Sequence, residues 1–198
     1  MPNSSGMAYK ITGNWKKGLA FDKHTLSSSY LGIDEFGHDK WNNTRSEMGE
    51  LVYQLKYQGK TDVIPKIIEL LDGIKGIEEM DLIVSIPPTD ENRQFQPVSL
   101  IAQALGKHRN VKVDSDLQLK KQGGSQLKNI DDPIERQRLL RDSITISTSR
   151  DVSGLKILLI DDLYRSGATL SVATDLLLKQ GQASSVSVLT MTKTRSKR

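Results

Sequence analysis

The segment Leu155–Leu170, LKILLIDDLYRSGATL, decides the predicted fold. It begins with an apolar run that does not alternate with polar residues, which is typical of a strand buried on both faces of a parallel sheet. Two carboxylates, Asp161 and Asp162, follow this run, and a short turn containing Ser, Gly and Thr comes next. We therefore expect a buried strand, an acidic pair at its carboxyl end and a helix that begins near Thr169.

Strand and helix patterns alternate through the second half of the chain. This order favours an α/β fold with a central, mostly parallel sheet flanked by helices. Gly59, Gly106 and Gly181 are expected to end three of the helices. The predicted helices cover 47–59, 61–74, 96–106 and 169–181, and the predicted strands cover 81–86, 111–113, 155–160 and 185–191.

The composition changes near residue 50, where a region rich in Gly, Asn and Ser gives way to helical spacing. We expect loops and short strands before that point, with Trp15, Phe21 and Trp41 forming a small core. The chain is accordingly divided into a flexible N-terminus (1–8), a small N-terminal lobe (9–50), a main domain (51–192) and a basic tail (193–198).

Composition excludes several kinds of chemistry. The chain of 198 residues has no cysteine, so it has no disulfide, thiolate zinc site, iron–sulfur cluster or cysteine nucleophile. No apolar run approaches the ~18 residues of a membrane span, and no secretory signal pattern is present. We therefore expect a cytoplasmic protein without a membrane partner. The net charge of +4 suits a small polyanionic substrate, and the basic tail suits weak contact with nucleic acid.

The turn after the acidic pair has the features of an anion site. Gly167 allows the backbone to approach a ligand closely, and Ser166 and Thr169 supply hydroxyl groups. The following helix directs its unpaired N–H groups at the turn, where a phosphate fits. The carboxylates suit a polyhydroxylated group such as a ribose, or a metal ion. Acids at a strand end also serve as turn formers, but the whole segment favours a sugar phosphate.

The sequence resembles a known family in these residues. ILLIDDLYRSGATL is similar to the phosphoribosyl-diphosphate (PRPP) binding motif of type I phosphoribosyltransferases. LVYQLKYQGK, DLIVSIPPTDENRQFQPVSLIAQALG and LQLKKQGGSQLKN are similar to segments of its ComF-like branch, which is associated with DNA uptake. The resemblance covers about 48–192 and implies a type I phosphoribosyltransferase fold.

The resemblance also implies a role for each part of the site. Asp161 and Asp162 would hold the ribose 2- and 3-hydroxyl groups. A flexible lid, 120–141, would bring Lys120 or Lys121 to the pyrophosphate, and Mg²⁺ would bridge pyrophosphate and ribose oxygens without a direct protein ligand. The residues implied for the 5-phosphate are Arg165, Ser166, Gly167, Ala168 and Thr169. Those implied for the pyrophosphate loop are Ser85, Ile86, Pro87, Pro88 and Thr89, helped by Arg93.

The implied function is transfer of a phosphoribosyl group from PRPP to an unidentified nitrogenous acceptor, by a protein of a superfamily in which homodimers are usual. The alternative is a non-catalytic PRPP- or nucleotide-binding regulator, or a ComF-like accessory protein of DNA uptake or processing. Two departures bear on the acceptor. The cysteine zinc ribbon of ComF-like proteins is missing, and Arg165 stands where 6-oxopurine salvage enzymes have an Asp.

Overall fold

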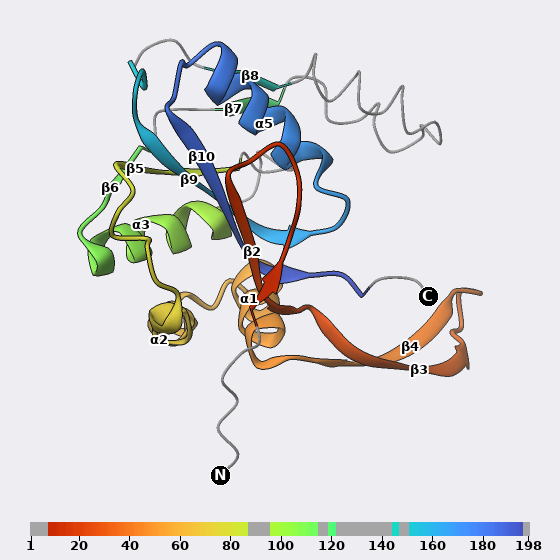
Figure 1. Cartoon of the computed structure of the whole chain (residues 1–198). Coiled ribbons are helices and arrows are strands. Elements are labelled where there is room, and N and C mark those ends of the chain that lie inside the picture. Colours follow the sequence, from red (N-terminus) through yellow and green to blue (C-terminus); the bar gives the residue numbers. More distant parts are fainter. Residues whose placement is uncertain (1–7, 87–95, 115–118, 122–143, 147–150, 196–198) are drawn as a thin grey trace.

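A computed structural model describes residues 8–86, 96–114, 119–121, 144–146 and 151–195 (Figure 1). Four residues assigned to the pyrophosphate site, Pro87, Pro88, Thr89 and Arg93, lie outside these ranges. Most of the predicted lid does as well. None of the helices in the described ranges is both long and apolar enough to span a bilayer.

A six-stranded sheet forms the centre of the described structure, with the strand order β1-β2-β10-β9-β5-β6. Every neighbouring pair is parallel except β1 and β2 at one edge. The predicted α/β class with a mostly parallel sheet is confirmed. The strands are β1 (Tyr9–Lys10), β2 (Lys17–Lys23), β5 (Leu82–Ser85), β6 (Lys112–Val113), β9 (Lys156–Tyr164) and β10 (Ser185–Lys193).

Helices cover both faces of this sheet (Figure 1). A hydrophobic core lies on each face of the sheet, and alternate residues of β9 point into one core or the other. Leu159 packs in the core that contains Leu177 of α5. Ile160 packs in the opposite core, with Leu55 of α1 and Leu105 of α3. The helices are α1 (Glu47–Gln58), α2 (Ile64–Leu70), α3 (Pro97–Arg109) and α5 (Ala168–Lys179), with 3₁₀ turns at Thr61–Val63 and Leu71–Gly73.

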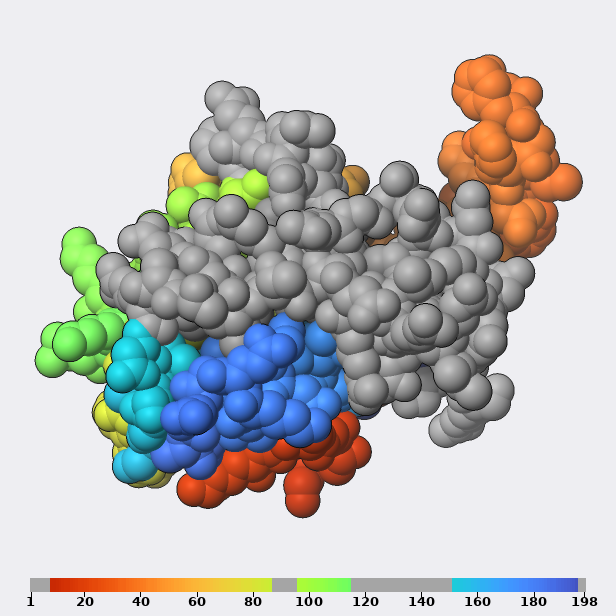
Figure 2. Space-filling view, turned by 90° about the horizontal axis from the view of Figure 1, so that it is seen from above, coloured from red at the N-terminus to blue at the C-terminus, as the bar shows by residue number. Residues whose placement is uncertain are grey.

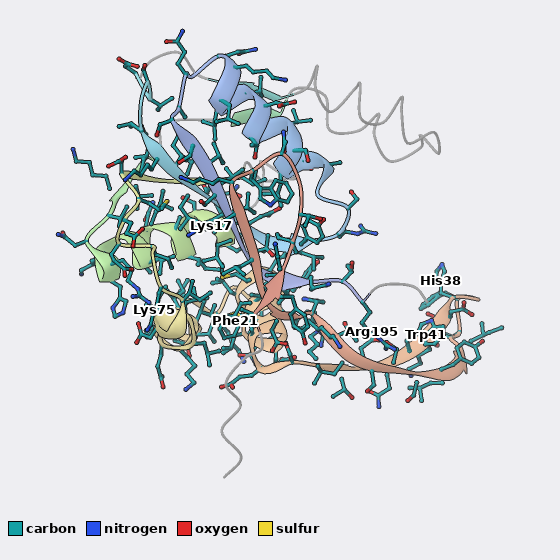
Figure 3. The ribbon with its side chains drawn as sticks, viewed as in Figure 1. Lys17, Phe21, His38, Trp41, Lys75 and Arg195 are labelled. Carbon is teal, nitrogen blue, oxygen red and sulfur yellow. The ribbon has the colours of Figure 1, made fainter. Side chains whose placement is uncertain are left out.

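The N-terminal region differs from the predicted lobe over 9–50. Strand β2 lies inside the central sheet, where Ala20 pairs with Thr190 of β10, so residues 9–23 belong to the main body. Only the hairpin of β3 (Thr25–Ile33) and β4 (Asp39–Arg45) projects from it (Figures 1 and 2). The expected aromatic core is therefore partly wrong. Trp15 and Phe21 are 7% exposed, but Trp41 is 50% exposed on the hairpin (Figure 3).

Two other predictions are corrected by packing. Helix α3 does not end at Gly106 but continues to Arg109, with Asn110 as its left-handed cap. Gly106 is needed inside the helix because an added Cβ would lie 2.2 Å from a methyl group of Val113. Lys120 lies in the short strand β7 (Leu119–Lys121), which pairs with β8 (Ile144–Ile146), so the predicted lid begins in a strand and not in a loop.

Candidate functional site

The acidic pair, Asp161 and Asp162, lies within β9 at the point where its neighbour β5 ends. The last register pair between these strands joins Ser85 to Ile160, and the N–H of Ile86 donates to the carbonyl of Ile160 at 2.8 Å. Strand β9 nevertheless continues to Tyr164, because it remains paired with β10. The acids are thus strand residues beyond the last described pairing of β9 with β5, and the strand continues past the acidic pair, where the sequence placed its end.

A hydrogen bond joins the two acidic residues. Asp161 Oδ1 accepts a hydrogen bond from the N–H of Asp162 at 2.8 Å. Burial and the neighbouring Asp162 carboxylate raise the pKa of Asp161 to about 8. Asp161 therefore holds a proton at neutral pH.

Lys56 of α1 supplies the positive charge at this pair. Its Nζ forms an ion pair with Asp162 Oδ2, and the exposed fractions of the two side chains are only 27% and 11%. Helix α1 is well fixed at both ends, because Ser46 Oγ accepts from the N–H of Gly49 and Gly59 ends the helix with a φ of 65°. The helix therefore holds Lys56 in its last turn against β9.

His24 and Thr192 lie next to the ion pair. Thr192 Oγ1 donates to the carbonyl of Asp162 at 3.0 Å and lies 3.3 Å from His24 Nδ1. Burial, followed by the Arg45 guanidinium, lowers the pKa of His24. Arg45 itself pairs with Glu50 at 3.3 Å. These groups connect the base of the hairpin to the acidic pair through a partly buried polar network.

The segment 165–169, here named the anion loop, joins β9 to α5. Gly167 has a φ of 75° and precedes the first helical residue, Ala168. The first N–H groups of the helix face the loop, and glycine has no side chain that could accept hydrogen bonds from them. Among the described residues, the one side-chain acceptor found there is Ser166 Oγ, which lies 3.4 Å from the N–H of Ala168. Arg165 and Ser166 are exposed, so a ligand can reach them.

Aromatic rings line the inner side of the anion loop. A Cβ on Gly167 would lie 2.8 Å from the ring of Tyr164 and 3.2 Å from the ring of Trp15. Those two rings meet edge to face, with their centroids 6.4 Å apart. The loop between β1 and β2 carries Trp15, and it is anchored on α5 by a 2.8 Å hydrogen bond from Asn14 Nδ2 to the carbonyl of Ser171. The N-terminal residues therefore support the anion loop directly.

The structure brings together most of the described part of the predicted site. Ser85 and Ile86 lie beside the acidic pair, and 165–169 follows it in the chain. The side chains of Lys120 and Lys121 are not described, and their proposed roles stay predictions. Sequence analysis missed Lys56, although it stands in LVYQLKYQGK, one of the segments that carried the ComF resemblance. The place of Lys56 in that segment was the available signal, although nothing in the sequence links the segment to the acids.

The described residues around the acidic pair do not form a ligand set for a divalent cation. No group of three or more His, Cys, Asp or Glu side chains suited to a metal occurs in the residues that the structure describes. At the acidic pair, Lys56 already occupies one carboxylate. The expectation that Mg²⁺ has no direct protein ligand stays a prediction.

The fold and site together define an α/β protein with an acidic pair and an anion loop at the carboxyl end of a parallel strand. The chain is 33% identical over 116 residues to the competence protein ComFC of Bacillus subtilis (strain 168), a match that covers 56% of this chain and 43% of that protein. The predicted similarity to ComF-like proteins is confirmed by this match. The match spans less than half the length of that relative. No family model matches the chain.

Two solved structures illustrate the likeness at the level of the fold. An adenine phosphoribosyltransferase from Thermoanaerobacter pseudethanolicus is 13% identical, with 83% of this chain and 94% of that chain covered and a TM-score of 0.41. An asparagine mutant at an invariant aspartic acid of HPRTs is also 13% identical, with 76% of this chain and 71% of that chain covered and a TM-score of 0.38. The fold class follows from the strand order and the parallel pairing of the central sheet.

Proposed function

We propose that this chain binds PRPP at the junction of β9 and α5 and transfers its phosphoribosyl group to a nitrogenous acceptor. One observation carries the proposal: a single short loop joins the acidic pair to the start of α5, where the cap residue Gly167 has no side chain. Carboxyl groups accept hydrogen bonds from hydroxyls, and a helix N-terminus binds phosphate. A ribose 5-phosphate presents both kinds of group from one molecule.

The remaining parts of the ligand have proposed partners as well. The diphosphate of PRPP would lie on the segment that starts at Ser85 and Ile86 and continues through Pro87, Pro88 and Arg93. Lys120 or Lys121 would approach it from the lid. Mg²⁺ would enter as the complex of PRPP, because the acidic pair offers no ligand set for it.

The proposed reaction breaks the bond from ribose C1 to the diphosphate oxygen and forms a bond from C1 to the acceptor nitrogen. Pyrophosphate leaves with the electron pair of the broken bond, and the acceptor nitrogen loses its proton. The transition state has oxocarbenium character, so the protein contributes by positioning the reactants and by excluding water, and it needs no covalent nucleophile.

A second function, binding without turnover, is favoured by one observation. The curated relative is a competence protein, and the ComF resemblance implies a role in DNA uptake or processing. A protein of that kind would use PRPP as a regulatory ligand or would contact DNA through basic residues such as those of 193–198. Its DNA affinity should fall steeply with salt and with removal of this tail.

Calorimetric titration of PRPP, with and without Mg²⁺, tests the proposal. Wild type should bind, and Asp161→Asn/Asp162→Asn should not, although it should unfold cooperatively like wild type. Equal binding by both proteins would contradict the assignment of the site. Pyrophosphate release from PRPP in the presence of mixed purine and pyrimidine bases then separates a transferase from a regulator, because only the transferase releases it.

A further inference from the structure

Charges at the acidic pair are balanced within the protein. Asp162 forms its ion pair with Lys56, and the N–H of Asp162 donates a hydrogen bond to Asp161 Oδ1 at 2.8 Å. Two ionised carboxylates and one ammonium would leave a net charge of −1 there, and a proton on Asp161 reduces it to zero. Other charged groups nearby, Arg45 and Glu50, compensate each other in an ion pair. A cation approaching this cluster therefore meets little negative potential.

We propose that Lys56 determines which ligands the acidic pair accepts, making it a receptor for hydroxyl groups and preventing it from binding a divalent cation. This inference rests on the proposed function, since it names a vicinal diol as the group that the pair recognises. Binding of a hydroxyl group requires hydrogen-bond acceptors and does not depend on the net charge of the site. Binding of a divalent cation requires several ionised oxygens.

The geometry explains why Lys56 has this effect. Its Nζ occupies Asp162 Oδ2, an oxygen that a metal ion would otherwise use, and the ion pair is largely shielded from solvent. A cation would have to displace the ammonium and also remove the proton of Asp161. A hydroxyl group has neither requirement, because it can approach the remaining carboxyl oxygens. Lys56 is thus a positioning residue, which acts through Asp162.

Titration of the ligand-free protein with Mn²⁺, followed by the electron paramagnetic resonance of the free ion, tests this role. Lys56→Met should bind Mn²⁺ at least about tenfold more tightly than wild type, because two carboxyl groups lose their neutralising partner. Lys56→Arg keeps the charge and should behave like wild type. The double variant Lys56→Met/Asp162→Asn should lose the gained affinity.

Lys66→Met is a matched control, because Lys66 also pairs with an acid, Glu69 at 3.0 Å, but on the exposed surface of α2. It should leave Mn²⁺ binding unchanged. If Lys56→Met does not fold, Lys56→Gln is the second variant. It removes the charge but can still donate a hydrogen bond to Asp162, and the same gain is expected.

Two results would overturn the inference. One is a folded Lys56→Met or Lys56→Gln protein that binds Mn²⁺ no more tightly than wild type. The other is wild type that binds Mn²⁺ through the acidic pair, shown by loss of that binding in Asp161→Asn/Asp162→Asn. Because no PRPP is present, neither result depends on whether the chain binds PRPP, so failure of the proposed function is recognised separately by the calorimetric titration.

Discussion

Lys56 in the last turn of α1 forms an ion pair with Asp162 in β9, across a separation of 106 residues in the sequence. This contact joins the segment that carries the LKY tripeptide to the acidic pair. It fixes the position of one carboxylate, and it lies on the face of the sheet that α1, α2 and α3 cover. The site is therefore built from two distant parts of the chain, and its properties depend on both.

Removal of Lys56 should destabilise the fold. Lys56→Met leaves Asp162, whose side chain is 11% exposed, without its partner, and we expect a loss of roughly 1–3 kcal/mol in the free energy of unfolding. Urea denaturation measures the change. Lys66→Met, which breaks the exposed pair with Glu69, should cost less than about 0.5 kcal/mol. Equal stability of the two variants would show that the ion pair with Asp162 contributes nothing.

Asp161 should make stability depend on pH. Its pKa rises from 3.8 to about 8 in the folded protein, so the folded state holds a proton that the unfolded state releases, and stability falls as pH rises between these values. Asp161→Asn has no ionisable group at this position, so its stability does not fall for this reason as pH rises. The stability of Asp161→Asn relative to wild type should therefore increase by about 1 kcal/mol or more from pH 5 to pH 8.

Urea denaturation at several pH values checks this difference, with Asp62→Asn at the exposed residue Asp62 as the control. The control should show a difference from wild type that does not change with pH. A constant difference for Asp161→Asn as well would mean that the Asp161 carboxyl is ionised in the folded protein at neutral pH.

Gly167 should be required for packing as well as for backbone conformation. Gly167→Ala and Gly154→Ala replace glycines with nearly the same φ, 75° and 74°, but only the first meets other atoms, since a Cβ there lies 2.8 Å from Tyr164. We expect Gly154→Ala to cost about 1 kcal/mol and Gly167→Ala at least ~1 kcal/mol more. Equal costs, measured by urea denaturation, would mean that the aromatic rings move aside without penalty.

The two tryptophans should report different environments. In Trp41→Phe the remaining Trp15 is 7% exposed, so emission should lie at shorter wavelength and resist quenching by iodide. In Trp15→Phe the remaining Trp41 is 50% exposed and should be quenched readily. Trp41→Phe should also leave stability within about 0.5 kcal/mol of wild type, because the side chain lies on the projecting hairpin. Similar quenching in both variants would contradict the corrected assignment of the N-terminal region.

Local patterns predicted the parts of the fold that short segments determine. The apolar run before Asp161, the glycine turn and the helix after it are all encoded within Leu155–Leu170, and the structure has a strand and a helix there. The extension of β9 to Tyr164 was missed, because it depends on pairing with β10. Strand β2 was missed for the same reason, since its parallel partner is near the opposite end of the chain.

Contacts at a distance account for the other errors. Gly106 has the local signature of a helix end, but the helix continues because the missing Cβ leaves room for Val113. Neither segment alone predicted the ion pair between Lys56 and Asp162, because a lysine near the end of a helix is usually solvated. The similarity to ComF-like proteins named both segments without saying that they touch.

The most direct test of the account compares ribose 5-phosphate with 2-deoxyribose 5-phosphate by equilibrium titration, in wild type and in Asp161→Asn/Asp162→Asn. If the acidic pair holds the ribose hydroxyls, wild type should bind the ribose compound about tenfold more tightly or better, and the variant should bind both equally. A preference of the same size in both proteins, or no preference in wild type, would contradict the account, because the acids would then make no contact with the 2-hydroxyl group.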